Sequence, residues 1–305
     1  MRPGFRLLVI LLTLLTLPLA ASAEKTAIQT VSWTPAQLAT GSPCLFTIHL
    51  EGVPSSVHAR WMDHEIVFFP GAPHTWYGLA GVDVEAKPGE YKLAIEADLP
   101  DGKAIREERT VLVEPAKYKT EVLHVPDRYV QPDPETLRRI DAEKEIKKAA
   151  FAHEIAEPEW SGKFVPPIDT SVSEGFGTRR TFNGKLASVH RGLDYHAKPG
   201  SPVTAANSGE VVLARELFYE GNCVIIDHGQ QFMTLYMHLS KLEVKEGDKV
   251  EKGQQIGLSG ATGRATGPHL HVAARWQGAY LDPAQLWTLP LPNLPATLSS
   301  QPGVQ

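Results

Sequence analysis

The chain has 305 residues, of which 42% are hydrophobic, so it is long enough for two modest domains that each bury a core. It carries 30 Lys and Arg residues against 35 Asp and Glu, which gives a formal net charge of −5, and it has no basic run. This mildly acidic balance argues against a protein that binds nucleic acid electrostatically, so we expect no nucleic-acid partner.

Residues 1–23 are typical of a signal peptide. Arg2 and Arg6 precede an apolar run from residue 7 to 17, and Ala21-Ser22-Ala23 is a small-residue cleavage pattern. We expect cleavage after Ala23 and export of the mature chain. The run is short for a membrane span, and an uncleaved anchor is the alternative.

Residues 24–114 predict a β-sandwich. Tyr91, Leu93 and Ile95 alternate with polar neighbours, and the sequence LPDG at 99–102 is a hairpin-type turn. Short strands at this spacing are typical of two packed antiparallel sheets. The histidines of this segment show no ligand spacing, so we expect structural or solvent-facing roles for them: His49, His58, His64 and His74.

Residues 115–165 are expected to link two domains. A helix is predicted near 134–156, because Asp133 is a good N-cap and Pro134 suits the first turn.

Charged pairs four residues apart support this helix. Glu135 with Arg139, and Glu143 with Lys147, have the favourable order along the chain. A structural linker helix, packed on one or both domains, accounts for the pattern.

Residues 166–289 predict a second domain, built from many short strands separated by glycine turns. This pattern favours a compact antiparallel β domain, so the whole chain is expected to be mainly β. A proline-rich tail, residues 290–305, is expected to be disordered or loosely packed.

The two cysteines, Cys44 and Cys223, fall in different predicted domains. Cys223 lies in the apolar run CVII at 223–226, where a single cysteine behaves as a small hydrophobic residue. We therefore expect buried free thiols, although a disulfide would suit an exported protein.

The second domain concentrates residues that bind metals or transfer protons. They are His190, Asp194, His238, His269 and His271. On a strand, His269 and His271 point to one face, about 7 Å apart along the chain. A straight strand would separate His190 from Asp194 by roughly 13 Å, so both reach one ion only if the chain turns, as it can at Gly192.

A catalytic zinc ion takes three protein ligands and keeps a fourth position for water. Structural zinc is typically closed by four ligands rich in cysteine, so a His and Asp set favours a hydrolase site. Five candidates compete for three ligand positions, and spacing alone leaves the choice open.

Five motifs occur in order across residues 166–289. They are HxGxD (His190 to Asp194), GxPVxAxxxGxV (Gly200 to Val211), YxHLS (Tyr236 to Ser240), VxxGDxVxxGQxIGxxGxTG (Val244 to Gly263) and TGPHLHxxxR (Thr266 to Arg275). In these motifs the chain resembles the lysostaphin/LytM-type zinc metallopeptidases, which hydrolyse peptide bridges in bacterial peptidoglycan.

The resemblance implies a role for each of the five candidates. His190, Asp194 and His271 match the ligands of one zinc ion per chain, and His238 and His269 match the catalytic pair. Since all five are present, the resemblance is to active members.

The resemblance also implies substrate contacts and a domain arrangement. Family members carry a GxGxR stretch along the substrate groove, and we expect Arg180, Asn183 and Tyr236 to contact substrate. Residues 76–91 resemble part of the immunoglobulin-like domain that precedes the peptidase in some exported members.

Two other classes fit parts of the sequence. The run from Val244 to Gln254 also resembles biotinyl and lipoyl carrier domains, but residues 257–267 offer no lysine for modification. A non-catalytic member that binds the cell wall or activates an amidase is the main alternative, although such relatives usually lack one or more of the five residues.

The expected function is therefore a periplasmic zinc endopeptidase that acts on peptidoglycan peptide stems, with D,D-endopeptidase activity first and glycyl-glycine cleavage second. Attachment to the inner membrane is expected if the signal is uncleaved. Because the linker is long, we also expect the N-terminal domain or the linker to cover the groove until substrate or a regulatory protein partner moves it.

Overall fold

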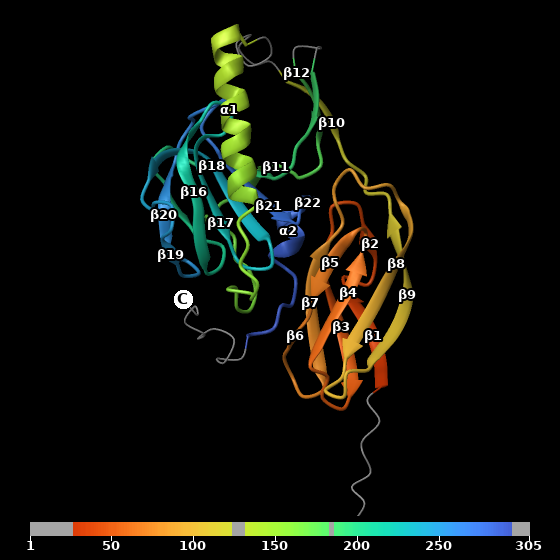
Figure 1. Ribbon diagram of the computed structural model, residues 1–305. Coiled ribbons are helices and arrows are strands. Elements are labelled where there is room, and N and C mark those ends of the chain that lie inside the picture. The colour runs from red at the N-terminus through yellow and green to blue at the C-terminus, as the bar shows by residue number, and fades with distance from the viewer. Residues whose placement is uncertain (1–26, 124–131, 183–185, 295–305) are drawn as a thin grey trace, which may run out of the picture.

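The structure is a computed structural model that describes residues 27–123, 132–182 and 186–294 (Figure 1). Strands make up 48% of the structure and helices 9%, which confirms the prediction of a mainly β protein. The predicted signal peptide lies outside the described residues. Within the described ranges, no helix has the length and apolar character needed to cross a bilayer.

The described strands between residues 27 and 114 form two sheets. One sheet has the order β1 (Ala27–Thr34), β3 (Pro43–Glu51), β7 (Thr75–Gly81) and β6 (Phe69–Pro70); the other has the order β2 (Leu38–Ala39), β9 (Ala104–Glu114), β8 (Gly89–Asp98), β4 (Ser56–Trp61) and β5 (His64–Val67). Leu93 and Ile95 of β8 point inward, as their alternation predicts, and Phe46 packs edge-on against Trp61 at 5.3 Å. Apolar side chains from both sheets thus share one core.

The linker contains a strand and a helix. Strand β10 (Thr120–Leu123) pairs in parallel with β12 of the second domain, and α1 (Pro134–Phe151) lies along that domain. Asp133 caps α1 as predicted, since its Oδ1 accepts hydrogen bonds from the N–H groups of Glu135 and Thr136 at 2.9 and 2.8 Å.

The predicted helix end at residue 156 is wrong, because α1 ends at Phe151. Ala152 caps the helix, and His153 Nδ1 then lies 2.9 Å from Asp227 Oδ2 at the end of β17. The N–H of Gln230 also donates to the carbonyl of Ile155 at 2.6 Å. These tertiary contacts draw the chain out of the helical path.

The predicted charge pairs along α1 are also wrong. Arg139 Nε donates to Glu143 Oε1 at 2.7 Å, and Lys147 forms an ion pair with Glu220 of the second domain. Glu143 Oε2 accepts from the N–H of Phe218 at 2.7 Å. The helix is therefore bound to the turn between β16 and β17 by its charged face.

The second domain is built on one large sheet. Its described strands are β11 (Val172–Glu174), β14 (Leu193–Tyr195), β15 (Pro202–Thr204), β16 (Gly209–Leu217), β17 (Gly221–Asp227), β18 (Phe232–Leu242), β19 (Lys249–Val250), β20 (Gln255–Ser259), β21 (Leu270–Trp276) and β22 (Ala279–Leu281). The pair β12 (Arg179–Phe182) and β13 (Leu186–Val189) forms a separate sheet with β10, and a short helix α2 (Pro283–Leu286) follows β22. All pairings within the large sheet are antiparallel, as predicted.

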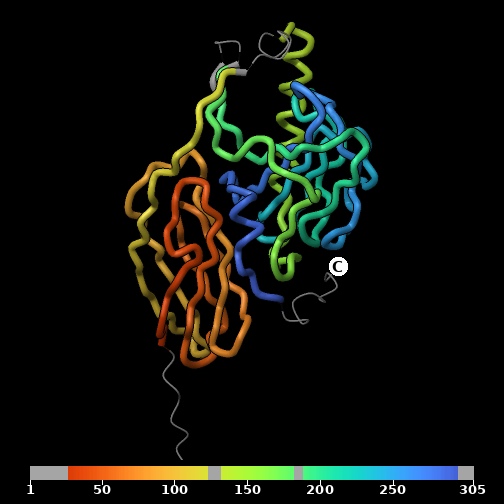
Figure 2. Tube along the Cα trace, turned by 180° about the vertical axis from the view of Figure 1, so that it is seen from behind, coloured from red at the N-terminus to blue at the C-terminus, as the bar shows by residue number. Residues whose placement is uncertain are grey.

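The two domains pack against each other, with α2 between them in both views (Figures 1 and 2). Asp83 Oδ2 accepts a hydrogen bond from the N–H of Tyr280 at 2.8 Å, and the carbonyl of Gly41 accepts from Asp282 at 2.7 Å. At the groove described below, Glu85 forms an ion pair with Arg191.

The predicted loose tail is wrong for its first residues. Leu291 is 6% exposed, and the N–H of Leu294 donates to Ser161 Oγ at 3.2 Å, so the tail packs on the second domain up to that point. Residues 295–305 lie outside the described residues. Cys44 and Cys223 are buried free thiols, as expected.

Candidate metal centre and catalytic groove

A groove of about 680 Å³ opens above the large sheet of the second domain. Its lining includes all five candidates from the sequence: His190, Asp194, His238, His269 and His271. They come from three strands and the segments next to them, so the groove exists only once the sheet has formed.

Strand register brings the three predicted ligands together. Asp194 of β14 lies opposite His271 of β21, and the Asp194 Oδ1 to His271 Nδ1 distance is 2.7 Å. His190, which precedes β14, places its Nε2 3.1 Å from both Asp194 Oδ1 and His271 Nδ1. Within the described part of the chain, these residues form the one group with metal-ligand geometry.

Gly192 allows this convergence by its small size. A Cβ atom at this position would lie 2.4 Å from the carbonyl oxygen of Val272 and 2.6 Å from His271 Nε2. The chain bends at Gly192, as predicted, and the glycine is also required because β14 passes so close to β21.

The donor set fits a divalent metal ion. His190 Nδ1 lies 2.9 Å from the carbonyl of Gly175, which only accepts, so Nδ1 carries the proton and Nε2 presents a lone pair. That lone pair faces the carboxylate oxygen of Asp194 in a site where His190 is 2% exposed. Converging lone pairs in a buried site are stabilised by a cation.

The charge states of the site also suit a metal. Burial raises the pKa of Asp194, but its contacts with the imidazoles of His190 and His271 outweigh burial and hold that pKa well below its usual range. Burial lowers the pKa of His271, although the Asp194 carboxylate acts in the opposite direction. An ionised carboxylate and a neutral imidazole are the forms that bind zinc.

His238 reaches the groove through an unusual backbone conformation. Met237 lies opposite His271 in the pairing of β18 with β21, so regular alternation would turn His238 to the other face. Instead, His238 has φ of 63°, a left-handed conformation that is rare outside glycine. Its N–H donates to the carbonyl of Glu220 at 2.8 Å. Strained backbone of this kind is concentrated at functional sites.

The other two histidines, His238 and His269, both bind a backbone carbonyl through Nδ1 and leave Nε2 free to accept a proton. The Nδ1 of His238 donates to the carbonyl of Thr262 at 2.8 Å, and that of His269 donates to the carbonyl of Gly267 at 2.8 Å. Their rings lie 4.7 Å apart, and His269 Nε2 is 3.8 Å from Asp194 Oδ1. Two Nε2 lone pairs thus lie beside the metal-binding atoms.

Burial keeps His238 neutral. Desolvation, followed by the neighbouring rings of His269 and His271, lowers the pKa of His238 to about 3. At neutral pH this imidazole is therefore a proton acceptor.

Of the three predicted substrate-binding residues, the structure places one in the groove. Tyr236 is fully buried, and its hydroxyl is bonded to Thr234 and to the N–H of Ala206, so its prediction as a substrate-binding residue is wrong. Its strand position puts it on the core side of β18. Arg180 lines the groove but is bonded to two carboxylates, and Asn183 lies outside the described residues.

Two residues near the site escaped the sequence analysis. Glu174 contacts Arg180, and Glu220 lines the groove while its carbonyl holds His238. Glu174 directly precedes the GxGxR stretch, and this adjacency was the one available signal. Glu220 carries no sequence signal, because its role depends on a main-chain carbonyl.

The N-terminal domain borders the groove without covering it. Among the described residues, Glu85 is its one contribution to the lining, and the described part of the linker, residues 115–123 and 132–165, contributes nothing. The expected cover is therefore not seen in this arrangement.

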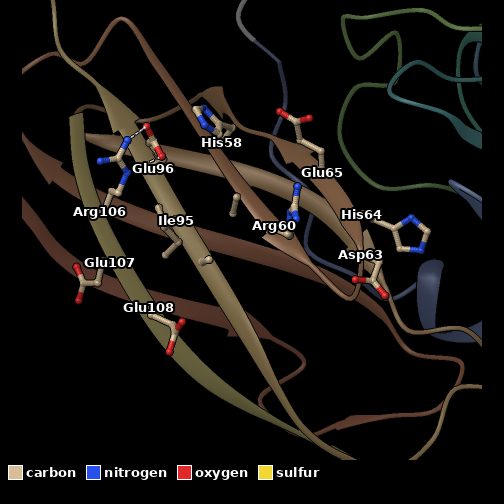
Figure 3. Close-up of a pocket in the computed structure, with 12 residues that line it drawn as sticks. His58, Arg60, Asp63, His64, Glu65, Ile95, Glu96, Arg106, Glu107 and Glu108 are labelled. Carbon is tan, nitrogen blue, oxygen red and sulfur yellow. Dashed lines mark hydrogen bonds and ion pairs between the residues drawn. The ribbon is translucent and has the colours of Figure 1, made fainter. Parts of the chain in front are cut away.

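A second hollow, of about 740 Å³, lies on the N-terminal domain over β4, β5, β8 and β9 (Figure 3). We call it the N-terminal hollow; its charged and histidine lining residues are His58, Arg60, Asp63, His64, Glu65, Glu96, Arg106, Glu107 and Glu108. Glu96 and Arg106 pair with each other through contacts of 2.8 and 2.6 Å.

Comparison with known proteins agrees with the geometry of the groove. Residues 188–283 match the model of peptidase family M23. A crystal structure of a suggested M23 peptidase from Pseudomonas aeruginosa superposes with a TM-score of 0.62 at 26% identity, and the match covers 82% of this chain and 95% of that one.

Two curated relatives match the second domain. Peptidoglycan DD-endopeptidase ShyA of Vibrio cholerae is 48% identical over 108 residues, which is 34% of this chain and 25% of ShyA. DD-carboxypeptidase/endopeptidase Mpg of Neisseria meningitidis is 40% identical over 129 residues, which is 42% of this chain and 30% of Mpg. The chain thus spans less than a third of the length of either relative. The second domain of this chain is therefore a peptidase M23 domain, and peptidases of family M23 are zinc metallopeptidases.

Proposed function

We propose that this chain is an exported zinc-dependent endopeptidase that hydrolyses peptide cross-links of bacterial peptidoglycan. One observation carries the proposal: a buried His-Asp-His metal site and two proton-accepting histidines converge in one groove. The endopeptidase names of ShyA and Mpg support the same substrate class.

His190, Asp194 and His271 would hold the zinc ion, since their ligand atoms face one point. Bound zinc would supply a Lewis acid that polarises a scissile carbonyl and lowers the pKa of a coordinated water to about 7.

His238 and His269 would handle the protons of the reaction. Each imidazole has its Nδ1–H fixed by a backbone carbonyl, so each Nε2 can take a proton from water. The protonated ring can then donate to the leaving amine, and such a role contributes on the order of 10²–10⁴ in rate. The neutral state of His238 matches the first of these tasks.

We further propose D,D-endopeptidase activity on the D-alanyl-diaminopimelate cross-link, by analogy with ShyA and Mpg. Digestion of purified cross-linked peptidoglycan with zinc, followed by mass analysis, tests both proposals. Conversion of dimeric to monomeric muropeptides by the mature protein, but not by His271→Ala, is expected. New glycine termini would instead show that the enzyme cleaves a glycyl-glycine bond. A protein that binds zinc and cleaves nothing would favour the amidase-activating alternative.

We also propose periplasmic localisation, which the signal-peptide pattern of residues 1–23 supports. Cell fractionation with N-terminal sequencing tests this, and a periplasmic protein that begins at Glu24 is expected. Recovery of the uncleaved chain with the inner membrane would show that the segment is an anchor, and recovery from the cytoplasm would contradict export.

A further inference from the structure

The two carboxylate oxygens of Asp194 lie in different surroundings. Oδ1 faces the imidazoles, 3.1 Å from His190 Nε2 and 2.7 Å from His271 Nδ1. Oδ2 instead accepts a hydrogen bond from Arg180 Nη2 at 2.8 Å. Only Oδ1 is therefore turned toward the metal-binding atoms.

Arg180 is itself held by a second carboxylate. Its Nε donates to Glu174 Oε1 at 2.8 Å, and its Nη2 also donates to Glu174 Oε2. The side chains are 15% exposed for Arg180, 17% for Glu174 and 11% for Asp194, so water screens these contacts only partly.

Strand register explains why a cation is needed here. Glu174 of β11 lies opposite Asp194 of β14, which places two carboxylates side by side. Like charges at such a position repel each other, and the planar guanidinium of Arg180 can bond to both at once. A lysine would lack this fork.

We propose that Arg180, held by Glu174, is a positioning residue that makes Asp194 a one-oxygen metal ligand. The guanidinium occupies Oδ2 and so stops it from taking a coordination position. A catalytic zinc site needs that position for water. The inference rests on the metal site of the proposed function but not on its substrate.

Metal binding by the full-length mature protein tests the proposal without any peptidase assay. In Arg180→Gln, we expect the zinc dissociation constant, measured by competition with a chromogenic chelator, to rise about 10- to 100-fold. With cobalt(II) in place of zinc, we expect weaker visible absorption, because a released Oδ2 raises the coordination number above four.

Arg215→Gln is the matched control. Arg215 makes the same forked contact with Glu246, at 2.8 and 2.6 Å, on a strand away from the groove. Its zinc affinity and cobalt spectrum should equal those of the unaltered protein. Melting curves of both variants show whether each is folded.

Loss of a positive charge near the ion would by itself tighten metal binding. The double variant Glu174→Gln/Arg180→Gln keeps the net charge constant and thus isolates the orientation of Asp194. We expect it to lose affinity and visible absorption as Arg180→Gln does. If either variant keeps the unaltered affinity and spectrum, or binds zinc more tightly, the proposal is wrong. Cleavage of peptidoglycan is scored separately, so failure of one proposal is not confused with failure of the other.

Discussion

The groove and the N-terminal hollow are alike in size and in the residue types that line them. Their volumes are about 680 and 740 Å³, and both contain histidines, arginines and acidic residues. In the groove, the metal-binding side chains are buried and their ligand atoms converge; His190 is 2% exposed and Asp194 is 8% exposed. In the hollow, the Arg106 side chain is 72% exposed and is satisfied by Glu96 (Figure 3).

Size and residue composition therefore do not distinguish a catalytic site from an ordinary surface hollow. Exposed charges on a sheet face can pair with one another or with water at little cost. Buried lone pairs that face each other are stable only with a cation between them. The convergence of such buried ligand atoms therefore identifies the metal site.

The largest effect should come from breaking the convergence in the groove. His190→Ala and Asp194→Ala are each expected to abolish zinc binding and activity, because two ligands do not hold the ion. Zinc content and peptidoglycan digestion measure this. His58→Ala in the N-terminal hollow is the matched control and should keep both.

Replacement of a proton-transfer residue should separate activity from metal binding. We expect His238→Ala to keep its zinc and to lose activity by about 10²- to 10⁴-fold. The same two measurements apply. Loss of zinc in His238→Ala would show that the ligand assignment is wrong.

Breaking the contact between α1 and the β16–β17 turn should lower catalytic activity without changing zinc binding. Glu143→Ala removes the acceptor for the N–H of Phe218, next to the turn whose Glu220 carbonyl holds His238. A small displacement of His238 is expected to lower kcat by up to about 10²-fold, with zinc content unchanged. Glu145→Ala, on the exposed side of the same helix, is the control. Equal kcat in the two variants would argue against this role for α1.

Acid should destabilise the second domain through a buried histidine. Burial lowers the pKa of His228 to about 4 from its ordinary value of 6.5, so between these pH values only the unfolded chain binds the proton. Stability should therefore be complete above pH 6.5 and fall by about 3 kcal/mol as the pH drops toward 4.

Urea unfolding at pH 7 and pH 4.5 measures this loss. In His228→Gln, which cannot be protonated, the difference between the two pH values should shrink by most of that amount. His58→Gln in the exposed hollow should leave the difference as it is. A His228→Gln protein with the full acid loss would assign the loss to other groups.

The smallest effect should come from the N-terminal hollow. Because Arg106 and Glu96 lie on an exposed sheet face, Arg106→Gln is expected to leave zinc affinity, peptidoglycan digestion and the melting midpoint unchanged. A loss of digestion with intact zinc binding would mean that the hollow contacts substrate. The groove would then not be the sole functional region of the two.

The sequence predicted the elements that depend on local chemistry. The alternation around Leu93, the Asp133 cap and the glycine turns of the second domain each gave the observed type of structure. The spacing of His190 and Asp194 around Gly192, with the family motifs, also identified the side chains that the structure brings together.

The errors share one physical cause, which is competition from tertiary contacts. Lys147 leaves its predicted helical partner for Glu220, and the helix ends early where His153 meets Asp227. Leu291 packs on the second domain although it lies in a proline-rich segment. A buried contact outweighs a local preference worth a few tenths of a kcal/mol.

The amino-acid sequence specifies a mainly β chain whose second domain carries four histidines and one aspartate in family spacing. How these groups act together depends on the fold. Strand register sets Asp194 against His271 and Glu174 against Asp194. The left-handed backbone conformation of His238 turns its own side chain into the groove. These relations join residues far apart in the chain, and distance in space is fixed only when the strands pair.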